Sequence, residues 1–327
     1  MLPDNVRREK QNPKKVKIWA YGLPMAGKSV FADQFPNVIH CNTDGNVTQL
    51  TGPVFVPKEK VVNGKVVLSA WENFKEFVRD ITSGEHSFET ISIDLIEDIY
   101  TYCREHYQKA LNIDHESDAA FGKGYDVIRK DFLITIGKLA KSPYNIIMLS
   151  HLVEAPFKTR GGFTKTALRT PLSDKIANKL AGLVDVVARV YRKEIEHKGL
   201  IVNAHMIQIS NEADIFGGTR LTDLHIEEME LNVPEFLKVL GLDIQVEKVQ
   251  NVTLYGIEPT IVNDVNNQRV PEPVRAVPVV EETPVVKEEP VVKEEPKVET
   301  KKDVVDQMLK AEGKRLTARE RRNLQND

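Results

Sequence analysis

A glycine-bounded loop at residues 22–29 constrains this chain more than any other feature. It carries the complete G-x-x-x-x-G-K-[ST] pattern. Residues 16–21 before it have the alternation of a strand, and residues 30–35 after it have the pattern of a short helix that Pro36 ends. Together these segments predict a loop whose backbone N–H groups surround phosphate oxygens at the start of a helix.

The pattern assigns a role to each position of the loop. We expect nucleotide phosphates to contact Gly22, Leu23, Pro24, Met25, Ala26, Gly27, Lys28, Ser29 and Val30. Lys28 can reach the β- and γ-phosphates and is the first candidate catalytic residue, while the Ser29 hydroxyl is a candidate ligand of Mg²⁺. The predicted cofactors are therefore ATP and Mg²⁺. A glycine-rich turn that binds nothing is disfavoured, because a lysine and a serine have no packing reason to occupy it.

Acidic residues follow two predicted strands. Residues 88–94 form an apolar strand pattern that ends in Asp94, which we expect to hold the Mg²⁺ shell. Asp44 follows the predicted strand 37–42, where a carboxylate could orient or deprotonate a water. An ordinary Asp-Gly turn explains Asp44 equally well. Glu97, at the start of the next predicted helix, is the rival of Asp44 for that water.

Two further residues are candidates for sensing a phosphate. The apolar run 144–150 predicts a buried parallel strand that leads into His151. His151 could detect the γ-phosphate or be a structural histidine. Arg220 follows a Gly-Gly-Thr segment and could reach a phosphate of its own chain or of a neighbour. A surface arginine is the alternative.

The remaining patterns describe the scaffold and one candidate DNA surface. Trp71, Phe74 and Phe77 recur at helical spacing and predict a core-facing stripe, and Asn63-Gly64 between valine pairs predicts a hairpin. Residues 154–170 combine four basic residues, two glycines and two phenylalanines, which we interpret as a loop suited to single-stranded DNA. A solvated hairpin is the alternative. Antiparallel strands are expected later in the chain, around residues 184–210.

Composition limits the compartment and the partners. The chain has 327 residues, 41% of them hydrophobic, and a net charge of −3, so any nucleic-acid site must be a local patch. Two cysteines without metal-ligand spacing fit a reducing compartment. The polar first 15 residues lack a signal-peptide core, and no run of 18 apolar residues occurs. We therefore expect a cytoplasmic protein that does not enter a membrane.

The phosphate loop and several shorter segments resemble a known family. These are residues 42–46, 92–94, 121–125, 146–151 and 217–220. They are similar to the small RecA-like ATPases of tailed phages, a group that includes single-strand annealing proteins related to the RadA-type recombinase core. The resemblance implies a RecA-type core, ATP with Mg²⁺, and a role in phage DNA recombination or replication. Lys28, Ser29 and Asp94 would bind phosphate and metal, and Asp44 would occupy the catalytic acid position, where such cores commonly carry glutamate.

The predicted organisation has four parts. Residues 1–14 form a flexible arm, and residues 15–245 form an α/β RecA-like P-loop domain with a mainly parallel sheet, flanking helices and antiparallel strands at the sheet end. Residues 246–302 form an acidic disordered linker, in which Pro-Val-Val-Lys-Glu-Glu occurs twice in succession, and residues 303–327 form a short basic helix.

The predicted function is Mg²⁺-dependent ATP hydrolysis coupled to single-stranded DNA binding and annealing. A single-strand DNA-binding protein is a candidate partner, and a homo-oligomer is compatible with this interpretation. Two alternatives stay open. One is an ATP-switched adaptor or loader that acts through its tail. The other is a nucleotide or small-molecule kinase in which basic residues hold the acceptor.

Overall fold

The computed structural model describes residues 13–115, 118, 123–158, 162–210, 214–221, 224–246 and 253–263. All of them belong to one compact unit, Met1–Val270. The expected flexible arm up to residue 12, most of the linker and the basic C-terminal helix lie outside these residues. The elements are β1 (Lys17–Gly22), α1 (Lys28–Asp33), β2 (Val38–Asn42), β3 (Val54–Phe55), β4 (Lys60–Val62), β5 (Lys65–Leu68), α2 (Ala70–Ser83), β6 (Thr90–Asp94), α3 (Ile96–Leu111), α4 (Lys123–Ala140), β7 (Asn145–His151), β8 (Val153–Lys158), β9 (Thr164–Arg169), α5 (Asp174–Ala181), β10 (Val186–His197), β11 (Leu200–Ile209), β12 (Gly218–Thr219), β13 (Leu224–Glu230), α6 (Val233–Val239) and β14 (Thr260–Asn263).

A ten-stranded sheet organises the described unit. Its order is β14-β13-β11-β10-β1-β7-β6-β2-β3, with β12 paired to β10. The pairs from β10 through β1, β7, β6 and β2 to β3 are parallel, whereas β11 to β14 join by antiparallel pairing. The predicted α/β class, with a mainly parallel sheet and antiparallel strands at one end, is therefore confirmed.

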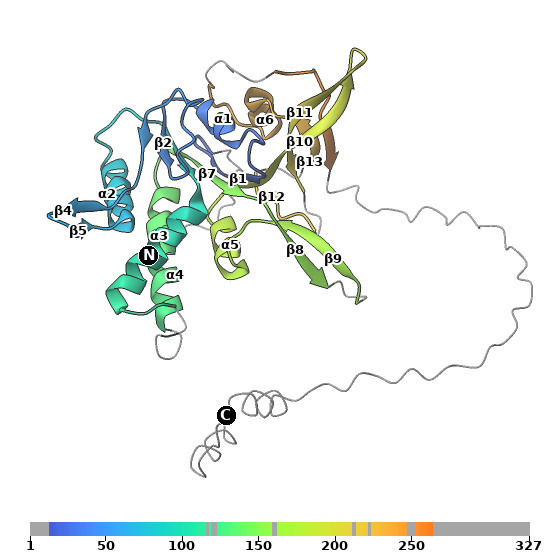
Figure 1. The fold of residues 1–327 in the computed structure, drawn as a ribbon. Coiled ribbons are helices and arrows are strands. Elements are labelled where there is room, and N and C mark those ends of the chain that lie inside the picture. Colours follow the sequence, from blue (N-terminus) through green and yellow to red (C-terminus); the bar gives the residue numbers. More distant parts are fainter. Residues whose placement is uncertain are drawn as a thin grey trace, which may run out of the picture. The chain divides into compact units, whose positions relative to one another are not determined.

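Helices cover both faces of the sheet (Figure 1). Along β1, Trp19 and Tyr21 point into the core shared with α2, α3, α4 and α5, while Ile18 and Ala20 point into the core shared with α1 and α6. Successive strand residues face opposite sides, so a strand covered on both sides must be apolar throughout. That requirement explains why β1 and β7 are almost continuous apolar runs.

Helix α2 shows how local sequence fixes an element. Ser69 accepts a hydrogen bond from the backbone N–H of Glu72, whose carboxylate in turn accepts one from the Ser69 N–H. This capping box starts the helix, and Gly84, with φ 80°, ends it. Trp71, Phe74 and Phe77 are buried, which confirms the predicted core-facing stripe.

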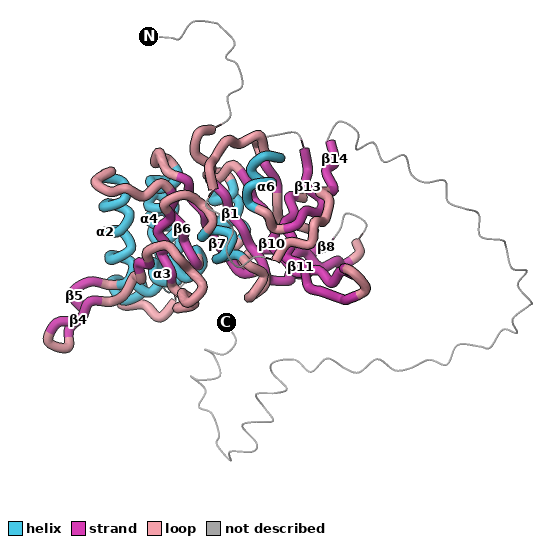
Figure 2. Tube along the Cα trace, turned by 90° about the horizontal axis from the view of Figure 1, so that it is seen from above, coloured by secondary structure: helices cyan, strands magenta, loops and turns pink. Residues whose placement is uncertain are grey.

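Two hairpins project from the layers. The predicted turn at Asn63-Gly64 is confirmed, since both residues have positive φ and join β4 to β5 (Figure 2). The expected loop at residues 154–170 is wrong, because β8 and β9 pair there from Val153↔Arg169 to Lys158↔Thr164. The alternative, a hairpin, is what forms: threonines favour a strand, and Gly162, with φ 83°, accepts the turn.

The sheet uses residues beyond 245, the expected end of the domain. Strand β13 pairs with β11, and β14 pairs with β13 through Leu224↔Asn263 and Ile226↔Ile261. Part of the expected linker therefore completes an edge of the sheet. Both cysteines are buried, and Cys41 and Cys103 lie in the same core layer, with α2, α3 and α4. Among the described residues, no helix has the length and apolarity needed to cross a membrane.

Asp33, the last residue of α1, anchors the far end of the loop that follows β2. Its carboxylate accepts hydrogen bonds from the Thr51 N–H at 3.0 Å, the Thr51 hydroxyl at 2.8 Å, the Gly52 N–H at 3.0 Å and His40 Nε2 at 2.8 Å. Burial raises the pKa of Asp33, but these donors outweigh it and hold the pKa at about 2. The 43–52 loop, which carries Asp44, is thereby held against the helix of the phosphate loop.

We expect Asp33→Asn to lower the free energy of unfolding by about 1–3 kcal/mol at pH 7, because an amide turns a donor toward groups that already donate. The depressed pKa fixes the sign of the pH dependence. The stabilisation is fully present above about pH 4 and is lost as the pH falls toward 2. Urea unfolding of the wild type and of Asp33→Asn between pH 7 and pH 3 measures the difference in their free energies of unfolding. Asp126→Asn, at an exposed helical aspartate, is the control. A difference in unfolding free energy that does not narrow on acidification would contradict the stabilising role of the ionised Asp33 carboxylate.

Candidate nucleotide-binding site

The phosphate loop connects β1 to α1 at the carboxyl edge of the parallel strands (Figure 1). Gly22 must lack a side chain, because a Cβ there would lie 2.0 Å from the Val190 carbonyl oxygen. Met25 and Gly27 have φ of 62° and 97°, which bends the backbone into a concave turn. Within the loop, Ala26 is buried, whereas Leu23 and Met25 are exposed.

Lys28 is buried at the base of the loop. Its ammonium group donates to the carbonyl oxygens of Gly22 and Leu23, both at 3.0 Å. Burial lowers the pKa of Lys28, and the negative charges of Asp94, Glu97 and Asp44 oppose that shift. One lysine and three carboxylates thus share this site, so the phosphates of a nucleotide would need additional positive charge to bind there.

Ser29 and Asp94 meet at the centre of the site. The Ser29 hydroxyl donates to Asp94 Oδ2 at 2.6 Å. Asp94 is buried, and burial raises its pKa although the hydrogen bond from Ser29 and the charge of Lys28 act in the opposite direction. Because the hydroxyl hydrogen points to Asp94, the oxygen lone pairs of Ser29 are left for a cation.

This donor set fits Mg²⁺. The described residues contain no group of three or more acidic, histidine or cysteine side chains that could hold a metal by themselves. Mg²⁺ in such sites takes one or two protein oxygens and completes its shell with phosphate and water. Ser29 would supply the direct oxygen, and Asp94 would bind the water shell. The bound metal would neutralise phosphate charge.

Glu97 holds the end of β7, the strand between β1 and β6. Its carboxylate accepts a hydrogen bond from the Ser150 hydroxyl at 2.7 Å and another from the His151 N–H at 2.7 Å. His151 Nδ1 also lies 3.1 Å from Glu97 Oε1. His151 is paired in register with Gly22, so the structure brings His151 and Glu97 to the start of the phosphate loop.

Asp44 lies in an Asp-Gly turn, which is the alternative explanation that the sequence offered for this residue. Its carboxylate accepts hydrogen bonds from the Asn42 side chain at 2.8 Å and from the Asn46 N–H at 3.0 Å, and Gly45 has φ 80°. Burial raises the pKa of Asp44, but these bonds prevail and leave it below the ordinary value. Asp44 is nevertheless exposed and close enough for its charge to act on Lys28 and Asp94.

Sequence reasoning missed the residue that joins these segments. The Thr43 hydroxyl accepts from the Leu95 N–H at 2.9 Å and donates to Asp98 at 2.6 Å. Thr43 therefore ties the end of β2 to the junction of β6 and α3. Its place directly after a predicted strand was the only available signal, and serine or threonine is common there for many reasons.

Arg220 is not brought to the phosphate loop. It follows β12, which pairs with the first residues of β10, and the Arg220 N–H donates to the Asp185 carbonyl. Its guanidinium donates to the carbonyls of Ala181 and Gly182 at the end of α5, at 3.2 and 3.3 Å. Because β10 runs parallel to β1, Arg220 lies at the amino ends of the parallel strands, whereas the phosphate loop lies at their carboxyl ends. The prediction that Arg220 contacts a phosphate bound by its own chain is therefore wrong.

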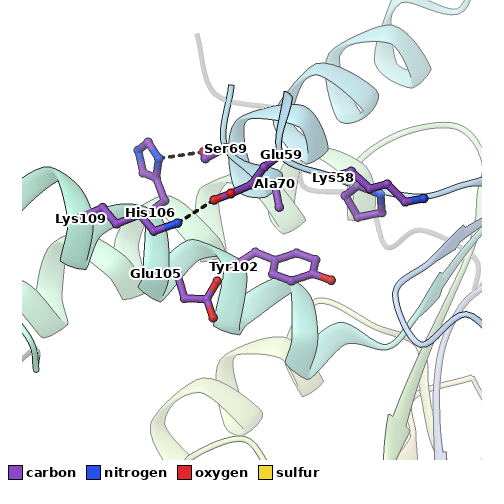
Figure 3. A pocket seen from close by; sticks show the side chains of 9 residues that line it. Lys58, Glu59, Ser69, Ala70, Tyr102, Glu105, His106 and Lys109 are labelled. Carbon is purple, nitrogen blue, oxygen red and sulfur yellow. Dashed lines mark hydrogen bonds and ion pairs between the residues drawn. The ribbon is translucent and has the colours of Figure 1, made fainter. Parts of the chain in front are cut away.

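A separate pocket lies between residues 57–59, the beginning of α2 and the middle of α3 (Figure 3). Its volume is about 260 Å³, and Ser69, Tyr102, His106 and Lys109 are among its lining residues. Ser69 contacts His106, and Lys109 forms an ion pair with Glu59. No residue predicted for the nucleotide site lines this pocket.

The comparison with protein families decides the relationship. A family model described as an AAA domain matches residues 14–221. The chain belongs to the AAA domain family. The match contains the phosphate loop, Asp94, Glu97 and His151, which identifies these residues as parts of a P-loop NTPase domain. A comparison with curated proteins found no match.

The AAA domain predicts a specific role for the Ser29 hydroxyl. We expect Ser29→Ala to weaken ATP binding about tenfold or more in the presence of Mg²⁺ and to change it little with a chelator, because only the cation ligand is removed. Titration of a fluorescent ATP analogue with and without Mg²⁺ measures this difference. Ser83→Ala, at an exposed serine ending α2, is the control. Equal loss under both conditions would contradict the metal role.

Proposed function

We propose that this AAA domain binds and hydrolyses ATP with Mg²⁺ and couples the cycle to single-stranded DNA. One observation carries the proposal. Ser150 and His151, which end β7, are both bonded to Glu97, and the hairpin β8–β9 begins two residues after His151. A change around the phosphates therefore has a short covalent path to an exposed surface.

The side chains divide the work of phosphoryl transfer, which depends mostly on positioning and neutralisation of charge. Lys28 would bind the β- and γ-phosphates, and Ser29 and Asp94 would hold the metal. The Glu97 carboxylate is only 13% exposed and accepts hydrogen bonds from Ser150 and His151, so we assign Glu97 to position His151. Both oxygens of Asp44 also accept hydrogen bonds, from Asn42 and Asn46, but Asp44 is exposed beside the site and can accept a further bond from a water, which favours it as the group that orients the nucleophile.

The hairpin β8–β9 is the proposed DNA surface. Phe163, at its turn, is 75% exposed, and Lys165 is exposed on β9. An exposed ring gives a base a stacking partner, and a lysine pairs with the adjacent phosphate. We extend the proposal to strand annealing in phage DNA recombination or replication, with a single-strand DNA-binding protein as partner and a homo-oligomer as the working form. This extension rests on the resemblance to RecA-like phage ATPases.

We expect single-stranded DNA to raise the steady-state ATPase rate at low salt and to do so less at moderate salt, because phosphate contacts release counterions. Lys28→Ala should abolish turnover at both salt concentrations. Turnover that survives Lys28→Ala would contradict the site. A rate that DNA leaves unchanged would contradict the DNA assignment and favour the kinase or the adaptor, which acceptor screening and removal of residues after 270 would then separate.

A separate measurement of DNA affinity tests the hairpin. Phe163→Ala and Lys165→Ala should each weaken single-stranded DNA binding about tenfold, as expected for one lost stacking or phosphate contact. Lys65→Ala, at an exposed lysine of the other hairpin, is the matched control. Fluorescence anisotropy of a labelled oligonucleotide measures the affinity. Equal affinities for all three variants would exclude β8–β9 as the contact.

The positioning role of Glu97 predicts a split between binding and turnover. We expect Glu97→Gln to keep ATP affinity within about threefold and to lower kcat at least about tenfold, because the amide retains one acceptor but cannot satisfy both Ser150 and His151. Stopped-flow binding and steady-state turnover give the two values. A matched loss in both would instead indicate a general disturbance of the site.

A further inference from the structure

His205, in the middle of β11, contacts the phosphate loop. Its Nδ1 lies 2.9 Å from the Ala26 carbonyl oxygen, across 179 residues of sequence. The carbonyl can only accept a hydrogen bond, so His205 must carry a proton on Nδ1 and donate it. The contact is close: a Cβ on Gly27 would lie 3.1 Å from the same nitrogen and 3.1 Å from the Leu231 side chain.

The direction of this bond fixes the peptide group between Ala26 and Gly27. In a trans peptide the C=O and the following N–H point in opposite directions. Since the Ala26 carbonyl is turned toward His205 on β11, the Gly27 N–H is turned away from β11. The reversed orientation would present a carbonyl oxygen to the phosphates in place of a donor.

Glycine alone cannot hold that orientation. Gly27 has φ 97°, in the left-handed region, and glycine visits positive and negative φ about equally. A rotation of the 26–27 peptide therefore meets little resistance from the backbone itself. The loop favours a glycine because of this positive φ and because a Cβ would crowd His205 and Leu231, and that glycine makes the peptide free to turn.

We propose that His205 is a positioning residue of the nucleotide site, which locks the 26–27 peptide with the Gly27 N–H toward the phosphates. This inference rests on the proposed nucleotide binding. His205 is itself held in place, because its carbonyl accepts the Leu231 N–H at 2.8 Å and its strand is paired on both sides with β10 and β13. The antiparallel end of the sheet thereby sets the geometry of the loop at the parallel centre.

The test compares His205→Leu with His205→Asn in the full chain. Leucine fills space without a donor, whereas the asparagine amide can replace Nδ1–H. We expect His205→Leu to weaken binding of ATP and ADP about five- to tenfold, the effect of one hydrogen bond, and His205→Asn to recover most of it. His197→Ala, on the same pair of strands but beside Tyr255, is the control. Thermal unfolding without nucleotide reports whether each variant is folded.

Two results would overturn the assignment. One is equal nucleotide affinity of folded His205→Leu and wild type, and the other is an asparagine variant no better than the leucine variant. The wild type gives an independent reading, because ¹⁵N spectra of its histidine rings should show His205 protonated on Nδ1, and a ring protonated on Nε2 alone would also overturn it. A wild type that binds no ATP would instead refute the proposed function, so the two failures are distinguishable.

Discussion

The hydrogen bond from Ser29 to Asp94 is the interaction on which the rest of the site depends. It joins the phosphate loop to β6, a strand that is not its neighbour, since β7 lies between β1 and β6. The bond can form only if all three strands end at one level, and their register makes them do so. Ser150 and His151, at the end of β7, consequently lie between the two sides of the site, and Glu97 accepts hydrogen bonds from both.

Burial acts on the two central charges in opposite directions and leaves them dependent on each other. It lowers the pKa of Lys28 and raises that of Asp94, and in each case the charge of the partner opposes the shift. Removing either charge would leave the other buried without its compensation, which costs more than the pair contributes. The surrounding carboxylates add negative charge, which a nucleotide would increase, and a bound cation would offset that charge.

Features written in a short stretch of sequence were predictable, and features created by pairing of distant strands were not. The phosphate loop, Asp94 and the order of strands and helices follow local patterns of glycine, apolar period and strand ends. Arg220 lies far from the phosphate loop, at the amino ends of the parallel strands, because β12 pairs with the start of β10, and no local sequence signal encodes that pairing. His205 escaped notice for the same reason: its contact with Ala26 depends on the register of β11. The sequence favoured a loop at residues 154–170 over the hairpin that forms, because glycines are common both in loops and in tight turns between strands.

The two buried cysteines give the chain an internal reporter. Cys41 and Cys103 belong to the core beneath α2, α3 and α4, whereas the core beneath α1 and α6 contains neither. Burial raises the pKa of both thiols, so each is unreactive while that layer stays closed. The rate at which a small thiol reagent modifies the untreated protein therefore measures opening of one face of the sheet separately from the other. The same concealment leaves the surface free of competing thiols, so a probe attached at an introduced cysteine would label that position selectively.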